Sequence, residues 1–263
     1  MIGRVEIARL SRAGNVDERT QERDYVLAWL LAAASARGFD LVLKGGTCLR
    51  RCYVPGYRYS EDLDFTLAPA AERTTLVDAV AWWCRWIGVE AGIRADAAAD
   101  ELAPTTRAWV SFTGPLAARR ERAIKVDLAD DEQVLNGVAL RPLSSGYSDL
   151  PDETHQVAAY SIEEIWAEKT RSLMQRAEPR DLYDLAFLAR EHPMLPSDAR
   201  SLFERKAAAK GLPGHALRDR LATRETTMKR MWDARLRDQV ADVPDFDATW
   251  RAVRRALRQG KYL

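Results

Sequence analysis

Residues 41–67 constrain the fold of this chain more than any other stretch. They begin with three apolar residues, 41–43, which are typical of a short buried strand. A Gly-Gly turn follows, and Thr47 is placed to cap a short helix over about residues 48–53. This order puts the backbone N–H groups of a turn at the start of a helix, where a phosphate can bind.

A second strand opens with the sequence Asp62-Leu63-Asp64-Phe65. Because strand side chains alternate between faces, the two aspartates point the same way and the two apolar residues point into the core. Neighbouring carboxylates repel each other unless a cation lies between them. Magnesium is usually held by one or two carboxylates together with substrate phosphates. The stretch therefore predicts a site for a nucleoside triphosphate and Mg²⁺; the alternative is a glycine turn followed by a solvated acidic strand end.

The composition is that of a globular cytosolic protein. The chain has 263 residues, of which 47% are hydrophobic and 30% charged, so one large or two modest domains are expected. No apolar run approaches the roughly 20 residues that span a bilayer, and the N-terminus lacks a signal-peptide pattern. We therefore expect a cytoplasmic location and no membrane partner. The three cysteines are an odd number without a secretion signal, which favours reduced thiols, and the three histidines are scattered, which argues against a zinc site.

Charge is distributed unevenly along the chain. Residues 200–263 contain 16 Lys and Arg against 8 Asp and Glu, a net charge of +8. The rest of the chain carries 24 against 31, a net charge of −7. A basic C-terminal segment indicates a phosphate-rich partner such as RNA; the alternative is a set of solvated, Arg-rich helix faces.

The segments before and after residues 41–67 predict further helices and strands of an α/β domain. Helices are expected over 17–36 and 70–88, and strands over 106–112 and 123–128. In the last of these strands Lys125 and Asp127 share one face, and the apolar Ile124, Val126 and Leu128 share the other. Lys125 is interpreted as a solvated side chain.

Beyond about residue 155 the pattern is almost entirely helical. Ser161 and Glu164 have the spacing of a capping box, and the helix that they open is expected to run to about Arg176. Further helices are expected over 180–190, from a cap at Ser197 to Gly211, and over 217–236 and 247–258. The sequence thus predicts a catalytic domain over 1–155 and a helical domain over 156–263.

Two strings of residues resemble a known family. The string KGGT followed by R-x-S-x-D-x-D-F, from Lys44 to Phe65, and the later E-K followed by R-D-L-Y-D-L, from Glu168 to Leu185, are similar to the motifs of the AbiEii-type nucleotidyltransferase toxins, which include the MenT toxins. The resemblance covers about the first 70% of the chain. It implies a nucleotidyltransferase core with a mixed sheet, an α+β arrangement, followed by an all-helical C-terminal domain.

The resemblance also implies roles for individual residues. A third carboxylate, Asp127, would complete the metal cluster of Asp62 and Asp64, or would help to orient the acceptor. Lys169 and one aspartate of the last motif would belong to the active site, but Asp181 and Asp184 match that motif equally well. The phosphate-binding candidates are Lys44, Gly45, Gly46, Thr47 and Ser60.

The activity implied is a Mg²⁺-dependent nucleotidyl transfer, of the EC 2.7.7 type, from a nucleoside triphosphate to an RNA acceptor. The resemblance suggests the 3′ end of tRNA, so that translation stops, and suggests a cognate antitoxin as partner. In some related systems the antitoxin is a kinase, which makes Ser60 a candidate phosphorylation site. The alternatives are a nucleotidyltransferase of small molecules, as in antibiotic modification, and a nucleotide-binding regulatory module without turnover.

Overall fold

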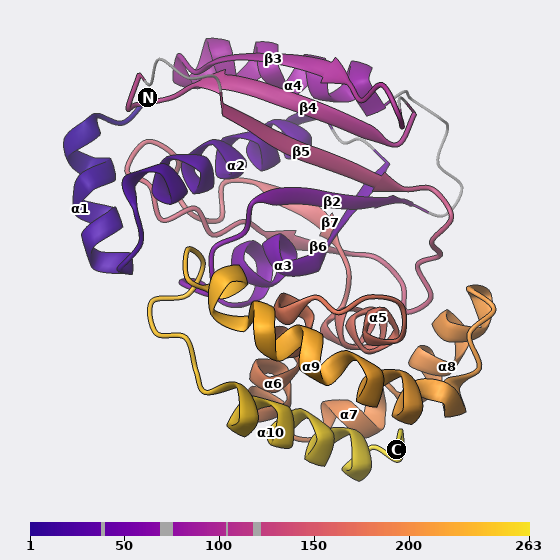
Figure 1. Cartoon of the computed structure of the whole chain (residues 1–263). Coiled ribbons are helices and arrows are strands. Elements are labelled where there is room, and N and C mark those ends of the chain that lie inside the picture. The colour runs from indigo at the N-terminus through magenta and orange to yellow at the C-terminus, as the bar shows by residue number, and fades with distance from the viewer. Residues whose placement is uncertain (38–39, 69–75, 104, 118–121) are drawn as a thin grey trace. The chain divides into compact units, whose positions relative to one another are not determined.

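A computed structural model describes residues 1–37, 40–68, 76–103, 105–117 and 122–263 (Figure 1). The chain forms two compact units. The first consists of Met1–Val134 and Val138–Tyr160, and the second consists of Leu135–Gly137 and Ser161–Leu263. None of the described helices combines the length and the apolar composition that crossing a bilayer requires.

The first unit is built on a seven-stranded sheet with the strand order β3-β4-β5-β2-β1-β7-β6. β2 runs parallel to β5 and β1 runs parallel to β7, whereas the other neighbours are antiparallel. The sheet is therefore mixed, as the family resemblance implied. Its strands are β1 (Leu41–Lys44), β2 (Asp62–Leu67), β3 (Arg94–Ala99), β4 (Arg107–Thr113), β5 (Arg122–Ala129), β6 (Ala139–Pro142) and β7 (Gln156–Ala159).

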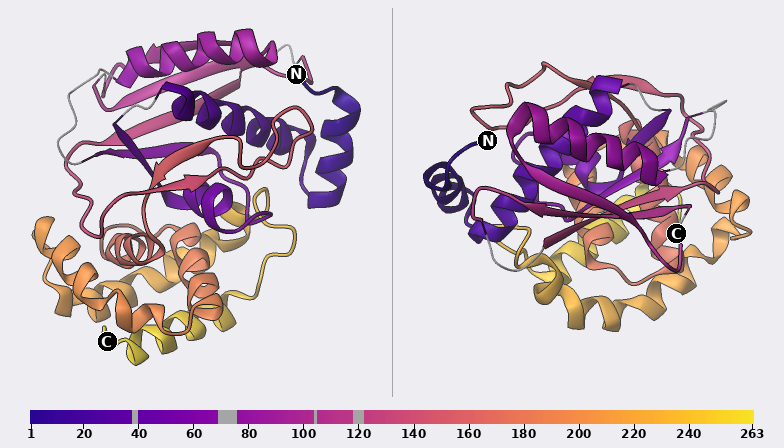
Figure 2. Two further views of the ribbon diagram at one scale, coloured as in Figure 1. Left: turned by 180° about the vertical axis from the view of Figure 1, so that it is seen from behind. Right: turned by 90° about the horizontal axis from the view of Figure 1, so that it is seen from above.

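Helices α2 (Glu18–Arg37) and α4 (Leu76–Ala91) lie on the same side of this sheet (Figures 1 and 2). The indole of Trp83 on α4 packs on Phe65 of β2, with ring centroids 5.6 Å apart. The alternate residues of the central strands that face the helices are fully or almost fully buried: Leu63, Phe65, Ala108, Val110, Phe112, Ile124, Val126 and Leu128. This alternation is the reason that the remaining residues of the same strands share the opposite face.

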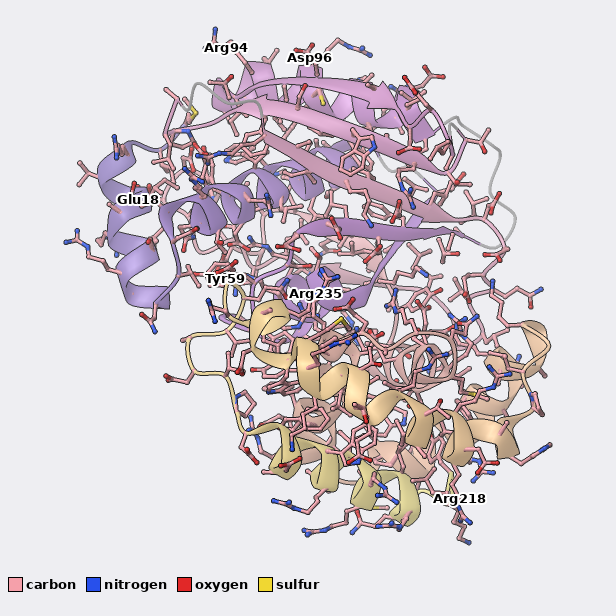
Figure 3. The ribbon with its side chains drawn as sticks, in the orientation of Figure 1. Glu18, Tyr59, Arg94, Asp96, Arg218 and Arg235 are labelled. Carbon is pink, nitrogen blue, oxygen red and sulfur yellow. The ribbon has the colours of Figure 1, made fainter. Side chains whose placement is uncertain are left out.

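That opposite face is called the polar face below. It carries Asp62 and Asp64 of β2, Arg107 and Trp109 of β4, and Lys125 and Asp127 of β5, as the strand registers show. On the edge strand β3, Arg94 and Asp96 are exposed (Figure 3). The polar face therefore presents charged and aromatic side chains from adjacent strands, and only the tertiary pairing brings them together.

Several local predictions need correction. The segment after β1 is α3 (Gly45–Cys48) followed by one π-helical stretch, η1 (Leu49–Tyr53), so Thr47 lies inside the helix rather than at its cap. The sequence did not predict α1 (Arg4–Gly14) or strands β3, β6 and β7, whose alanine-rich or short segments carry little β-propensity. The helix expected over 70–88 corresponds to α4, which covers Leu76–Ala91. Residues 70–75 of that expectation lie outside the described residues.

The second unit is helical. Ser161 caps α5 by accepting a hydrogen bond from the backbone N–H of Glu164, as predicted. The carboxylate of Glu164 accepts instead from the N–H groups of Leu135 and Asn136, and it pairs with buried Lys206 at 2.8 Å. The elements are α5 (Ile162–Gln175), α6 (Pro179–Glu191), α7 (Leu195–Asp198), α8 (Arg200–Ala209), η2 (Gly214–Ala216), α9 (Leu217–Leu236) and α10 (Phe246–Gln259).

Candidate active site

Four adjacent strands place two carboxylates between two cations in one row across the polar face. In the register of the sheet, Lys44 of β1 is opposite Asp64 of β2, Asp64 is opposite Asp127 of β5, and Asp127 is opposite Arg107 of β4. The Arg107 Nε lies 2.6 Å from Asp127 Oδ1. The order of charges along this row is therefore positive, negative, negative and positive, which stabilises two neighbouring carboxylates.

A second row lies next to the first. It consists of Asp62 on β2, Lys125 on β5 and Trp109 on β4. The ammonium nitrogen of Lys125 lies 2.7 Å from Asp127 Oδ2 and 3.5 Å from Asp62 Oδ2, so it bridges carboxylates of two strands. Burial by itself lowers the pKa of Lys125, but the hydrogen bond to Asp127 and the charge of Asp62 outweigh it and raise the pKa. Lys125 is thus held as a cation within the acidic cluster.

The backbone of the glycine turn approaches Asp64 closely. Gly45 has a φ of +72°, and a Cβ at this position would lie 2.9 Å from Asp64 Oδ2. Burial raises the pKa of Asp64, the charges of Asp62 and Asp127 add to that rise, and Lys44 and Lys125 oppose it. A glycine is required here both for the left-handed backbone and for the space that the carboxylate occupies.

The short helix is tied to the strand of the two aspartates by a side chain. The Thr47 hydroxyl donates a hydrogen bond of 2.7 Å to the backbone carbonyl of Asp62. Ser60 is partly exposed in the loop immediately before β2. Arg50 of η1 pairs with Asp24 of α2, with Nε 2.8 Å from Oδ1, and its guanidinium lies 4.0 Å from the centroid of the Tyr59 ring. These contacts join the segment of α3 and η1 to three neighbours: the start of β2, the loop before β2, and α2.

In the second unit, Lys169 of α5 is buried between two aspartates of α6. Its Nζ lies 2.6 Å from Asp184 Oδ2 and 3.0 Å from Asp181 Oδ1. Asp181 is also paired with Arg176, whose Nε lies 2.9 Å from Oδ2. Burial would raise the pKa of Asp181, but Lys169 and Arg176 outweigh it and hold the pKa below its ordinary value. The structure therefore brings together the three residues that match the last two motifs of the family.

The donor chemistry of β2 fits a magnesium ion. Asp62 and Asp64 offer carboxylate oxygens from one strand face, and hard cations prefer such ligands. Among the described residues, no group of three or more Asp, Glu, His or Cys side chains is arranged to hold a metal ion by itself. Since Mg²⁺ commonly takes one or two carboxylates and completes its shell with phosphates and water, a pair of aspartates is sufficient.

Three residues of the polar face were not predicted to be part of the site. Lys125 was interpreted as solvated, but it forms an ion pair with Asp127. Its position on the same strand face as Asp127 could have indicated this contact. Arg107 and Trp109 carried no signal in the sequence, because their positions beside β5 depend on the pairing of strands that are distant along the chain.

Comparisons with known proteins are consistent with this geometry. A family model described as "Nucleotidyl transferase AbiEii toxin, Type IV TA system" matches residues 29–258. No curated protein sequence matches the chain.

Among solved structures, the fold is similar to that of MenT4, a nucleotidyltransferase toxin from Mycobacterium tuberculosis H37Rv. The TM-score is 0.69 at 20% sequence identity, and the match covers 100% of this chain and 91% of MenT4. This likeness confirms the predicted fold class, a mixed sheet followed by a helical C-terminal region. Because the family model covers most of the sequence, the chain belongs to the AbiEii family of nucleotidyltransferase toxins.

Proposed function

We propose that this chain transfers a nucleotidyl group from a nucleoside triphosphate to the 3′ end of an RNA acceptor, with tRNA as the acceptor and loss of translation as the result. The observation that supports it best is the pair Asp62 and Asp64 on one strand face, beside the glycine turn at Gly45. Such a pair next to a phosphate-binding turn is suited to a triphosphate and a metal ion.

In this proposal Asp62 and Asp64 hold the magnesium ion, with Asp127 as the third carboxylate of the cluster or as a group that orients the acceptor. Bound there, the ion would neutralise charge on the reacting phosphate and activate the attacking oxygen. Lys44 lies opposite Asp64 in the sheet, so its charge is close to the phosphate oxygens in this arrangement. The triphosphate would be held by Lys44, Gly45, Gly46, Thr47 and Ser60.

We further propose that the helical unit contributes Lys169 to catalysis, as the family motifs imply. Its charge would offset that of the departing pyrophosphate. Asp181 and Asp184 would be positioning residues, because both bind the Lys169 ammonium. Asp181 also forms an ion pair with Arg176. Asp184 lies closer to the Lys169 ammonium than Asp181 does, at 2.6 Å against 3.0 Å.

An RNA acceptor is supported by the exposed basic side chains of the last helices. On α9, Arg218 and Arg235 are exposed near opposite ends of the helix (Figure 3). On α10, Arg251, Arg255 and Arg258 are exposed, while the apolar stripe with Trp250 and Val253 is buried. Rows of arginine on a helix attract the RNA backbone through its phosphates. We propose a cytoplasmic location as part of the same function.

We also propose a cognate antitoxin, which would act at Ser60. Ser60 lies two residues before Asp62 in the loop that leads into β2. A phosphate there would add about −1.5 to −2 charge beside two carboxylates. That charge would compete for the metal ion and repel the triphosphate, so that the modified protein would be inactive.

The experiment that tests the proposed function is incubation of the purified chain with radiolabelled nucleoside triphosphates, Mg²⁺ and total RNA. We expect label in RNA of tRNA size, and none with the Asp64→Asn variant. Label in a small molecule of a cell extract would instead indicate a nucleotidyltransferase of antibiotic type. Triphosphate binding without transfer to any acceptor would overturn the enzymatic proposal.

A further inference from the structure

Trp109 on β4 is an aromatic side chain held at the surface of the polar face. It remains 38% exposed, although tryptophan is usually buried over most of its area. Its indole Nε1 donates a hydrogen bond of 2.7 Å to Asp100 Oδ2. The polar end of the ring system is therefore anchored, and the exposed apolar part is kept in one place instead of rotating freely.

The sheet places this ring in line with the proposed metal site. Trp109 is opposite Lys125, and Lys125 is opposite Asp62, so the backbones at Trp109 and Asp62 are about 10 Å apart, two strand spacings. Arg107 lies two residues before Trp109 on the same face and contacts Asp127. The ring is thus bordered by two cations, Lys125 and Arg107, each of which is also paired with Asp127.

The strand order leaves different parts of the polar face for the triphosphate and for the RNA acceptor. Lys44 and Gly45, which are the proposed phosphate-binding groups, belong to the β1 side of β2. Trp109 and Arg107 belong to β4, on the other side of β2 and beyond β5. A triphosphate bound on the β1 side therefore leaves the β5 and β4 side of the polar face for the acceptor, whose hydroxyl oxygen makes the attack.

We propose that Trp109 is a stacking site for the terminal base of the single-stranded RNA acceptor, with Arg107 and Lys125 beside it to contact the adjoining phosphates. This inference rests on the proposed function and deepens it. An exposed aromatic ring with neighbouring cations is the combination by which proteins bind single-stranded nucleic acid. Because every base has a flat π-face, such a site fixes the position of the acceptor end without selecting its sequence.

The test uses the full chain with two substitutions of Trp109. Trp109→Ala removes the ring, and Trp109→Phe keeps an aromatic face but loses the hydrogen bond to Asp100. The matched control is Trp82→Ala, which removes a half-buried indole from α4, where Trp82 is stacked with Trp86. All proteins are first compared by their melting temperatures, so that a loss of folding is recognised.

Two affinities are then measured without catalysis. One is for a 5′-labelled single-stranded oligoribonucleotide on the order of eight nucleotides long, by fluorescence anisotropy. The other is for a non-hydrolysable nucleoside triphosphate with Mg²⁺. We expect Trp109→Ala to weaken RNA binding about 5- to 150-fold, the range for loss of one stacked base, and to leave triphosphate binding within about twofold. Trp109→Phe should retain most of the RNA affinity, and Trp82→Ala all of it.

The outcomes separate this site from the proposed function as a whole. If the parent protein binds and labels RNA, and Trp109→Ala does so equally well, the stacking site is wrong while the RNA acceptor stands. A Trp109→Ala protein that loses triphosphate affinity as much as RNA affinity would also overturn it, because the ring would then contact the other substrate. If the parent protein neither binds nor labels RNA, the RNA acceptor and the stacking site are both wrong.

Discussion

The ammonium of Lys125 lies 2.7 Å from the Asp127 carboxylate, on the strand next to the two aspartates of β2. The same ammonium also reaches Asp62, at 3.5 Å. Lys125 is therefore a built-in counter-ion of the acidic cluster, and it competes with any other cation that binds there.

Replacing Lys125 by methionine should increase the affinity for a divalent cation. The substitution removes a positive charge from the cluster while keeping a long apolar side chain, so we expect Mn²⁺ to bind about two- to fivefold more tightly, as for loss of one partly exposed charge pair. Isothermal titration with Mn²⁺ measures this. Lys229→Met is the matched control, because Lys229 forms an exposed pair with Asp247 on the helical unit. Unchanged or weaker Mn²⁺ binding by the Lys125 variant would contradict competition.

Gly45→Ala should damage the site more than its backbone strain alone explains. The substitution forces a residue with a side chain into φ +72°, which costs about 1–2 kcal/mol, and also places a methyl group against Asp64 Oδ2. Gly56→Ala is a matched control with φ +77° and open space around the added atom. Chemical denaturation should show a loss of unfolding free energy from backbone strain in both variants, and a larger loss in Gly45→Ala. Titration with Mn²⁺ should show weaker binding in Gly45→Ala only. Equal behaviour would mean that the contact with Asp64 is unimportant.

Acidic substitutions of Ser60 should inactivate the protein. Ser60→Asp and Ser60→Glu add a negative charge two residues before Asp62, which repels the triphosphate, whereas Ser60→Ala only removes a hydroxyl group. We expect triphosphate binding to fall about tenfold or more in the acidic variants and transfer to persist in part in Ser60→Ala. Triphosphate affinity and growth after induction are the measurements. Acidic variants that bind and transfer like the parent protein would rule out a phosphorylation switch at this position.

Asp24→Asn should destabilise the first unit and change its response to acid. The Asp24 carboxylate is buried and pairs with Arg51 at 2.7 Å and with Arg50 at 2.8 Å. Removing one partner of a buried ion pair costs about 3–5 kcal/mol. Urea denaturation at neutral pH should show this loss, and the exposed Asp40 provides a control, Asp40→Asn, which should be near neutral.

The sign of the pH effect follows from the pKa of Asp24. Burial would raise this pKa, but Arg51 and Arg50 outweigh it and lower it below 3.8, its ordinary value. A lowered carboxyl pKa stabilises the folded state above the unfolded pKa, and this stabilisation is lost as the pH falls through the folded pKa. The parent protein should therefore lose more stability than Asp24→Asn on acidification below about pH 4. Parallel loss in both proteins would show that Asp24 is not responsible.

Reversing the charges at Arg251, Arg254 and Arg255 of α10 should weaken RNA binding more than triphosphate binding. These arginines are exposed or half-buried and lie outside the buried apolar stripe of the helix, so the substitution to glutamate leaves the packing intact. The slope of log affinity against log salt should flatten by about 0.7 for each phosphate that the variant no longer neutralises. The control reverses three exposed charges of the first unit, Arg9, Arg12 and Arg19. An equal effect of both triple variants would indicate a general charge effect.

Much of the geometry of the candidate site could be predicted because it depends on short segments of the chain. The shared face of Asp62 and Asp64 follows from the two-residue period of a strand, and the common side of Asp181 and Asp184 follows from a helical spacing of three. The cap at Ser161 and the helices expected over 180–190, 217–236 and 247–258 were likewise correct, since caps and amphipathic periods are properties of short segments. The cap expected at Ser197 was wrong, because Ser197 lies inside α7 and α8 begins only at Arg200. The motif strings identified the family for the same reason.

What the sequence could not provide is the arrangement across strands. Asp127, Lys125, Arg107 and Trp109 join the two aspartates only because β5 pairs with β2 in parallel and with β4 in antiparallel orientation, and a shift of one residue would move each side chain to the other face. Pairing between distant segments is set by the packing of the whole sheet against its helices rather than by local propensity. The sequence by itself therefore determined that the aspartates of β2 share one strand face and those of α6 share one helix side, and the tertiary structure decided which cations and which aromatic ring lie around the pair on β2.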